Sequence, residues 1–210
     1  MLFTTTTFAL VFLPLVLAGF FLLGRWSETL AASWLLAASV FFYGYWMPEF
    51  TLLLVASIAV NFWVGGRIAR SVQGSHAPRP GPVSGRWLTV GVLFNLLLLG
   101  YFKYANFFID NVNAAFGLHW SFGRVILPIG ISFYTFTQIA YLVDTWSGKV
   151  NEYRPIHYGL FVTYFPHLIA GPVLHHAQMM PQFADLAVYR FNPSQFVSGL
   201  VIFGIDCSRR

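Results

Sequence analysis

LPIGISFYTFTQIAYLVDTWSGKV (residues 127–150) and YFPHLIAGPVLHHAQMMPQF (residues 164–183) are two apolar runs that carry Pro, Gly, Ser, Thr, Gln and His. Proline and glycine interrupt a helix, and the bilayer core has no water to satisfy the backbone groups that are freed. Such segments must lie inside protein or line a wet cavity, and polar residues at that depth are usually kept for function. We therefore expect broken or re-entrant membrane helices here, and the functional site among them.

The composition of the chain is that of a membrane protein. Charged residues are 9% of the 210 and hydrophobic residues are 57%, whereas a soluble domain carries about 25% charge. A membrane-spanning helix needs about 20 apolar residues, and four uncharged runs qualify. The expected spans lie at 4–24, 30–47, 50–66 and 87–108.

The remaining apolar segments complete the predicted fold class. A helix is expected at 127–144, opened by Pro128, and another at 156–170, broken at Gly171 and Pro172, because proline removes a backbone donor. Asn192 is an expected cap for a last helix at 195–205. The sequence thus predicts an all-α polytopic membrane protein with about six to seven membrane segments, broken helices included.

The orientation follows from the basic residues. Arg67, Arg70, Arg79 and Arg86 have no acidic residue between them, so the positive-inside rule places their loop in the cytoplasm and the N-terminus outside. The net charge of +5 does not indicate nucleic-acid binding, because Lys and Arg lie in loops and no basic cluster alternates with aromatic residues. A flexible loop is expected at 74–85, and an external loop that can hold a short interfacial helix is expected at 110–124.

The last residues interrupt an apolar helix after few apolar positions. We expect 206–210 (DCSRR) to be an aberrant or truncated tail, with a stop-transfer signal as the alternative. Residues 1–205 are expected to form one transmembrane domain. Cys207 is the single cysteine, which excludes an internal disulfide and a four-thiolate metal site.

The second run contains three histidines within a stretch of ten residues. His175 and His176 are adjacent and cannot share a helix face, and no carboxylate or cysteine lies at chelating distance from them or from His167, so no metal site is predicted. A histidine could act as a general base. The favoured interpretation is structural, with imidazoles bonded to loop carbonyls.

A polar seam follows the helix expected at 127–144. It comprises Ser132, Tyr134, Thr135, Thr137, Gln138 and Tyr141. No G-x-S-x-G surrounds Ser132, so it is not expected to be a nucleophile. Gln138 and Asp144 are the better candidates for lining a cavity. Asn61 and Asn95 lie deep in their spans and are expected to bond across helices.

At four stretches the chain resembles the membrane-bound O-acyltransferase family, in its alginate O-acetyltransferase-like branch. They are FFYGYWMPEFTLLLVASIAVNFWVGGRIA (41–69), LFNLLLLGYFKYANFFIDNVN (93–113), LPIGISFYTFTQIAYLVDTWSGKV (127–150) and FPHLIAGPVLHHAQMMPQF (165–183). The resemblance follows nearly all of 1–205 in order. It implies the N-terminal part of a multi-span enzyme of the bacterial inner membrane, with helices around a funnel.

The resemblance also implies an activity. An acyl group, expected to be acetyl, passes from an acyl-CoA or acyl-carrier thioester to an exported polysaccharide such as alginate. The donor is a substrate, and no bound cofactor is implied. Membrane lipid and periplasmic acetylation proteins are the other expected partners. The family's catalytic histidine lies in a later segment that none of the six histidines here matches, so the chain alone is expected to be inactive.

The resemblance places no catalytic residue in this chain and makes parts of it a tunnel wall. The candidates are Pro128, Ser132, Gln138, Asp144, Pro166, His167, Gly171, Pro172 and His175. Where alginate-type members usually have Gln in the FP-x-L-x-AGP block, this chain has His167.

Two other functions fit broken membrane helices. A transporter or flippase would bind its substrate at the midplane between two repeated broken helices, and no such repeat is visible. A non-catalytic membrane subunit would dock an acetylation partner instead.

Overall fold

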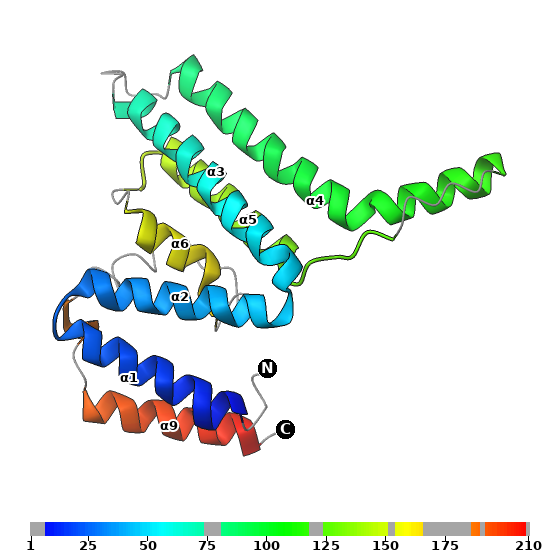
Figure 1. The fold of residues 1–210 in the computed structure, drawn as a ribbon. Coiled ribbons are helices and arrows are strands. Elements are labelled where there is room, and N and C mark those ends of the chain that lie inside the picture. The colour runs from blue at the N-terminus through cyan, green and yellow to red at the C-terminus, as the bar shows by residue number, and fades with distance from the viewer. Residues whose placement is uncertain are drawn as a thin grey trace.

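The computed structural model describes residues 7–73, 81–117, 124–150, 154–165, 186–189 and 192–208. In these ranges the chain is helical and contains no strand, which confirms the all-α class (Figure 1). The helices are η1 (Phe8–Phe12), α1 (Leu13–Gly24), α2 (Glu28–Trp46), α3 (Pro48–Gln73), α4 (Pro82–Phe116), α5 (Ile131–Trp146), α6 (Pro155–Thr163), η2 (Leu186–Tyr189) and α9 (Pro193–Ser208).

Helices α3, α4 and α5 form the central bundle, each in contact with the other two. Glycines let them approach closely. A Cβ on Gly91 of α4 would lie 2.6 Å from Cδ1 of Leu142 in α5 and 3.0 Å from Cγ1 of Val64 in α3. Small residues at such crossings are how membrane helices pack, since lipid provides no hydrophobic drive for association.

Helices α1 and α2 pack on each other beside the bundle, and α6 lies between α2 and the pair α3 and α5 (Figure 1). Aromatic rings of η1 pack against α2. Phe8 and Phe12 both lie 5.6 Å from Phe42, measured between ring centroids. Further along, Tyr189 of η2 stacks on Phe20 at 5.4 Å.

The expected external loop at 110–124 is wrong in its first part. Helix α4 continues to Phe116 and ends at Gly117, whose φ of 64° is left-handed. The residues at 110–116 continue the helix because no proline or glycine interrupts them, and glycine is the residue that takes the left-handed cap at low cost. At 35 residues, α4 is about 52 Å long, and its C-terminal part extends away from the bundle (Figure 1).

The two broken segments begin and end at other residues than predicted. Helix α5 begins at Ile131, because Pro128 lies in the turn before it and Gly130, with φ 75°, is its left-handed cap. Helix α6 ends at Thr163 instead of continuing to residue 170. The backbone leaves the helical region at Tyr164, which has φ −51° and ψ 108°. The nine residues of α6 span about 14 Å, too short to cross the hydrocarbon.

Other predictions have mixed outcomes. Asn192 caps α9 as predicted, because its Oδ1 accepts a bond of 3.0 Å from the backbone N–H of Ser194. Helix α9 extends to Ser208, so 206–208 continue the helix. Whether 206–210 form a truncated tail stays a prediction.

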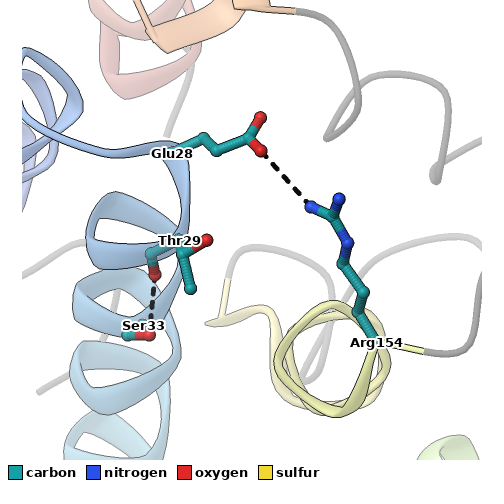
Figure 2. Close-up of polar contacts among 4 residues, drawn as sticks. All are labelled: Glu28, Thr29, Ser33 and Arg154. Atoms are coloured by element: carbon teal, nitrogen blue, oxygen red, sulfur yellow. Dashed lines mark hydrogen bonds and ion pairs between the residues drawn. The ribbon is translucent and has the colours of Figure 1, made fainter.

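An exposed ion pair joins the first turn of α2 to the N-cap residue of α6 (Figure 2). Nη1 of Arg154 lies 3.3 Å from Oε1 of Glu28, and the two side chains are 58% and 32% exposed. One helical turn after Glu28, the hydroxyl of Ser33 donates to the carbonyl of Thr29 at 2.7 Å (Figure 2). Such exposed pairs position helices more than they stabilise them.

Among the described residues, two helices are long and apolar enough, by length and composition, to cross a membrane: Pro48–Val72 of α3 and Pro82–Phe116 of α4. Large apolar side chains lie exposed on their outer faces, including Leu52, Val60, Leu93 and Leu97. An apolar exterior around a packed interior is typical of a membrane bundle. The number of membrane segments stays a prediction.

Candidate functional site

A buried polar cluster lies where α3, α4 and α5 meet. It comprises Ser57 and Asn61 of α3, Asn95 of α4 and Gln138 of α5, all of them buried. No member carries a formal charge. In an apolar bundle such groups must bond to one another, because an unpaired polar group costs about 1–3 kcal/mol.

Asn61 is the centre of the buried polar cluster. Its Nδ2 lies 2.9 Å from Oε1 of Gln138 and 3.3 Å from Oδ1 of Asn95. Asn95 in turn donates from Nδ2 to Oδ1 of Asn61 at 2.6 Å. The two asparagines thus exchange hydrogen bonds across α3 and α4, which confirms the prediction that they bond across helices.

Two side chains of α3 donate hydrogen bonds to the same atom of Gln138. Its Oε1 accepts from the hydroxyl of Ser57 at 2.8 Å and from Asn61. Ser57 and Asn61 are four residues apart and therefore share one face of α3. The main chain contributes as well, because the carbonyl of Ser57 accepts from Asn61 at 2.9 Å and that of Gly91 accepts from Asn95 at 2.8 Å.

Several buried polar atoms of these helices have hydrogen-bonding capacity left. Among the residues that the structure describes, Nε2 of Gln138 and Oγ1 of Thr135 are buried and have no hydrogen-bond partner, and the same holds for the hydroxyls of Tyr43, Tyr134 and Tyr158. These groups come from α2, α5 and α6. Nε2 of Gln138 can only donate, whereas the hydroxyls can donate or accept.

The tyrosines are fixed by packing. The rings of Tyr141 and Tyr158 lie 4.2 Å apart between centroids, joining α5 to α6. Tyr158 also lies 5.6 Å from Phe62 of α3. A Cβ on Gly65 would lie 2.6 Å from Cε1 of Tyr141, so this ring occupies the space that the glycine leaves open.

The structure separates the sequence-predicted site residues of α5. Pro128 is buried in the turn before the helix, Ser132 is half-buried in its first turn, and Asp144 is half-buried in its last turn. Ser132 and Asp144 are about 18 Å apart along the axis and belong to different ends of α5. Of these residues, Gln138 lies in the buried polar cluster.

Five predicted site residues lie outside the described residues. They are Pro166, His167, Gly171, Pro172 and His175. Their assignment to a tunnel wall stays a prediction.

Two residues of the interior were missed from the sequence. Ser57 bonds directly to Gln138, and its position four residues before Asn61 in an apolar run was the available signal. His157 is only 2% exposed in the first turn of α6, and no sequence pattern marked it. Within the residues that the structure describes, no three His, Cys, Asp or Glu side chains come together as metal ligands.

Comparison with known proteins identifies relatives along almost the whole chain. It is 37% identical to the peptidoglycan O-acetyltransferase of Helicobacter pylori, over 100% of this chain and 44% of that protein. It is 40% identical to the probable alginate O-acetylase AlgI of Pseudomonas syringae pv. tomato, over 96% of this chain and 39% of the relative. It is 41% identical to the probable alginate O-acetylase AlgI of Azotobacter vinelandii, over 87% of this chain and 36% of that relative.

The chain therefore spans less than half the length of these curated relatives. No family model matches it. No solved structure matches it either. The resemblance found in the sequence motifs is nevertheless confirmed by named homologues: the chain is a homologue of bacterial O-acetyltransferases and belongs with them to the membrane-bound O-acyltransferase family.

Proposed function

We propose that the protein to which these residues belong is a membrane-bound O-acetyltransferase that modifies an exported polysaccharide. The observation that carries the proposal is the identity of 37–41% with named O-acetyltransferases over 87–100% of the chain. The relatives do not favour a transporter, a flippase or a non-catalytic subunit, because those found are named for acetylation. The polysaccharide is a polymer of the alginate or peptidoglycan kind.

The proposed reaction moves an acetyl group from a cytoplasmic thioester to a hydroxyl of the polymer. The hydroxyl oxygen forms the new ester bond, the carbon–sulfur bond of the thioester breaks, and the hydroxyl proton leaves through a general base. The base is the histidine that the family resemblance implies, and it lies outside these 210 residues. Periplasmic acetylation proteins are the proposed further partners.

The proposed role of this part of the enzyme is to form the wall beside the reacting groups. Nε2 of Gln138 and Oγ1 of Thr135 support this role, because both are buried and neither has a hydrogen-bond partner within the described part of the chain. Oε1 of Gln138 is already fixed by Ser57 and Asn61, so the amide has one orientation. A fixed donor can position an ester or thioester carbonyl without the cost of being ordered first.

The decisive test is ester-bound acetate on the exported polymer. The intact gene is deleted in its host and then restored, and acetate released by mild alkali is measured per unit of polymer. Acetate should disappear with the deletion and return with the gene. Acetate unchanged by the deletion would overturn the proposed function.

The site assignment is tested in the same strain with two variants of α5. Gln138→Leu removes the amide and should lower acetylation severalfold. Thr137→Val is the matched control, since Thr137 is also buried but donates only to the carbonyl of Phe133 in its own helix. Membrane levels of both proteins are compared by immunoblot. Equal acetylation in the two variants, at equal levels, would refute the role of Gln138 and leave the proposed function standing.

The proposed topology is an inner-membrane protein of about six to seven membrane segments, with the N-terminus outside and the α3–α4 connection in the cytoplasm. It is testable with single cysteines in a Cys207→Ser background. A Cβ at Gly85 has nothing within 4 Å, and Phe116 is 74% exposed. Phe116→Cys should react with an impermeant maleimide in intact spheroplasts, and Gly85→Cys only after permeabilisation. The reverse pattern would invert the topology.

A further inference from the structure

The cytoplasmic end proposed for α3 and α4 holds an arginine between two tryptophans from different helices. The guanidinium carbon of Arg67 lies 4.8 Å from the ring centroid of Trp63, one turn earlier in α3, and 5.6 Å from that of Trp87 in α4. The two indoles pack edge to face, with centroids 5.3 Å apart. The sequence did not reveal this combination, because the second ring comes from the neighbouring helix.

The charge at this end is not neutralised. Arg67, Arg70 and Arg86 are all exposed, and none has a carboxylate partner in the part of the chain that the structure describes. Stacking on indole leaves the guanidinium N–H groups free to bond to an anion, and the planar fork of arginine suits phosphate oxygens. Within the described residues, this end of the bundle therefore presents an arginine that is held in place by the indoles and has no carboxylate partner.

Below the arginines, the outer faces of both helices are apolar. On α3, exposed Leu52, Val55, Val60 and Trp63 lead along one face to Arg67. On α4, exposed Leu97, Leu93 and Val90 lead to Arg86 in the same way. The helices lie next to each other, and these ends meet at one end of the bundle (Figure 1). We call this combination of Arg67, Arg86, Trp63 and Trp87 with its two apolar faces the α3–α4 surface.

We propose that the α3–α4 surface binds an anionic phospholipid, with the phosphate of its headgroup on Arg67 and Arg86 and its acyl chains along the apolar faces. Tryptophan beside arginine is the combination that favours the level of the headgroups, and basic residues at helix ends attract anionic lipids. A soluble phosphate compound would use the same arginines but would leave the apolar faces uncovered. The proposal rests on membrane insertion of the proposed function and not on acetyl transfer.

The test measures lipid preference in the 210-residue chain itself, reconstituted in bilayers. Phosphatidylglycerol or phosphatidylcholine brominated on its acyl chains quenches nearby tryptophans. Because the chain has seven tryptophans, the signal of Trp63 and Trp87 is taken as the difference from a Trp63→Phe/Trp87→Phe variant. Each arginine is expected to favour phosphatidylglycerol about fivefold, which corresponds to roughly 1 kcal/mol for a basic residue at an anionic surface.

Two comparisons make the result specific. Arg67→Gln/Arg86→Gln should remove the preference, whereas Arg25→Gln should keep it, because Arg25 is exposed at the α1–α2 connection without a tryptophan pair. Sodium chloride should weaken the preference of the unmodified chain, which tests the electrostatic origin even if the double variant does not insert.

Three results would overturn the proposal. Equal quenching by the two lipids would show that no anionic headgroup is bound. An equal loss in Arg25→Gln would show that only net charge matters. Loss of the preference in inorganic phosphate, but not in sodium chloride of the same ionic strength, would show that the arginines take a soluble phosphate instead of a lipid.

Discussion

Two polar contacts join helices that lie far apart in the sequence, and they are opposite in character. The buried polar cluster connects α3, α4 and α5 through uncharged amides and a hydroxyl that are excluded from the surface. Glu28 and Arg154 connect α2 and α6 through full charges on exposed side chains (Figure 2). The uncharged contact should contribute much more to stability, because its groups have no solvent to return to when a partner is lost.

The reason lies in the cost of losing a partner. An exposed carboxylate that loses its arginine is solvated by water, and the net loss is about 0–1 kcal/mol. A buried amide that loses its partner keeps its desolvation penalty of about 1–3 kcal/mol. In this bundle, the loss of a partner in the buried polar cluster should therefore cost more free energy of unfolding than the loss of a partner in the exposed ion pair.

The largest effect is expected from Asn61→Leu. The substitution removes the partner of Asn95 and one of the two donors to Gln138, and it should lower the free energy of unfolding by about 2–3 kcal/mol. The measurement is unfolding in mixed micelles with increasing denaturing detergent. The double variant Asn61→Leu/Asn95→Leu removes both amides, so it should lose less than the sum of the two single variants. Simple additivity would mean that the two amides do not act as a pair.

The next effect comes from packing around the buried polar cluster. Gly65→Ala would place a Cβ 2.6 Å from the ring of Tyr141, which is held against Tyr158, and should cost about 2 kcal/mol by overpacking. Gly66→Ala is the matched control in the same helix, because the nearest atom to its Cβ is 3.9 Å away. It should stabilise the helix by up to about 1 kcal/mol. Equal effects of both variants in the same detergent titration would show that Tyr141 does not need the space at Gly65.

The sequence predicted those parts of the molecule that depend on local rules. Apolar runs predicted α1 to α4 approximately, and Asn61 and Asn95 were expected to bond across helices because an amide in an apolar span has few other partners. Asn192 was expected as a cap from the chemistry of its side chain. Each of these predictions required only residues near one another in sequence.

The parts that were missed depend on residues far apart in sequence. Ser57 belongs to the candidate site because its hydroxyl bonds to Gln138, which lies 81 positions later in the sequence. Trp87 became a partner of Arg67 through the packing of α4 on α3. The end of α6 at Thr163 was mispredicted because the break was assigned to Gly171 and Pro172, whereas the chain leaves the helix at Tyr164. No single-sequence rule pairs such residues, because tertiary packing selects them.

A half-buried contact lies between the two extremes. The amide of Asn106 in α4 bonds twice to the main chain of Val125, donating to its carbonyl at 2.8 Å and accepting from its N–H at 2.9 Å. Asn106→Ala should cost about 1 kcal/mol and speed hydrogen exchange at the Val125 amide. Asn111→Ala is the control, since Asn111 is exposed and bonds only to the Phe107 carbonyl in its own helix. Unchanged exchange in Asn106→Ala would show that the pair does not hold residue 125 to α4.

The smallest effect on stability is expected from the exposed ion pair between Glu28 and Arg154. Glu28→Gln should lower the free energy of unfolding by about 0.5 kcal/mol or less, and Arg154→Gln should do the same, because both side chains remain hydrated. The coupling between them, from a double-mutant cycle in the same detergent titration, should shrink further in salt. A cost for Glu28→Gln equal to that of Asn61→Leu would mean that the α2–α6 pair is shielded from water. The charge of the partners, and not their burial, would then decide how much each contact contributes to stability.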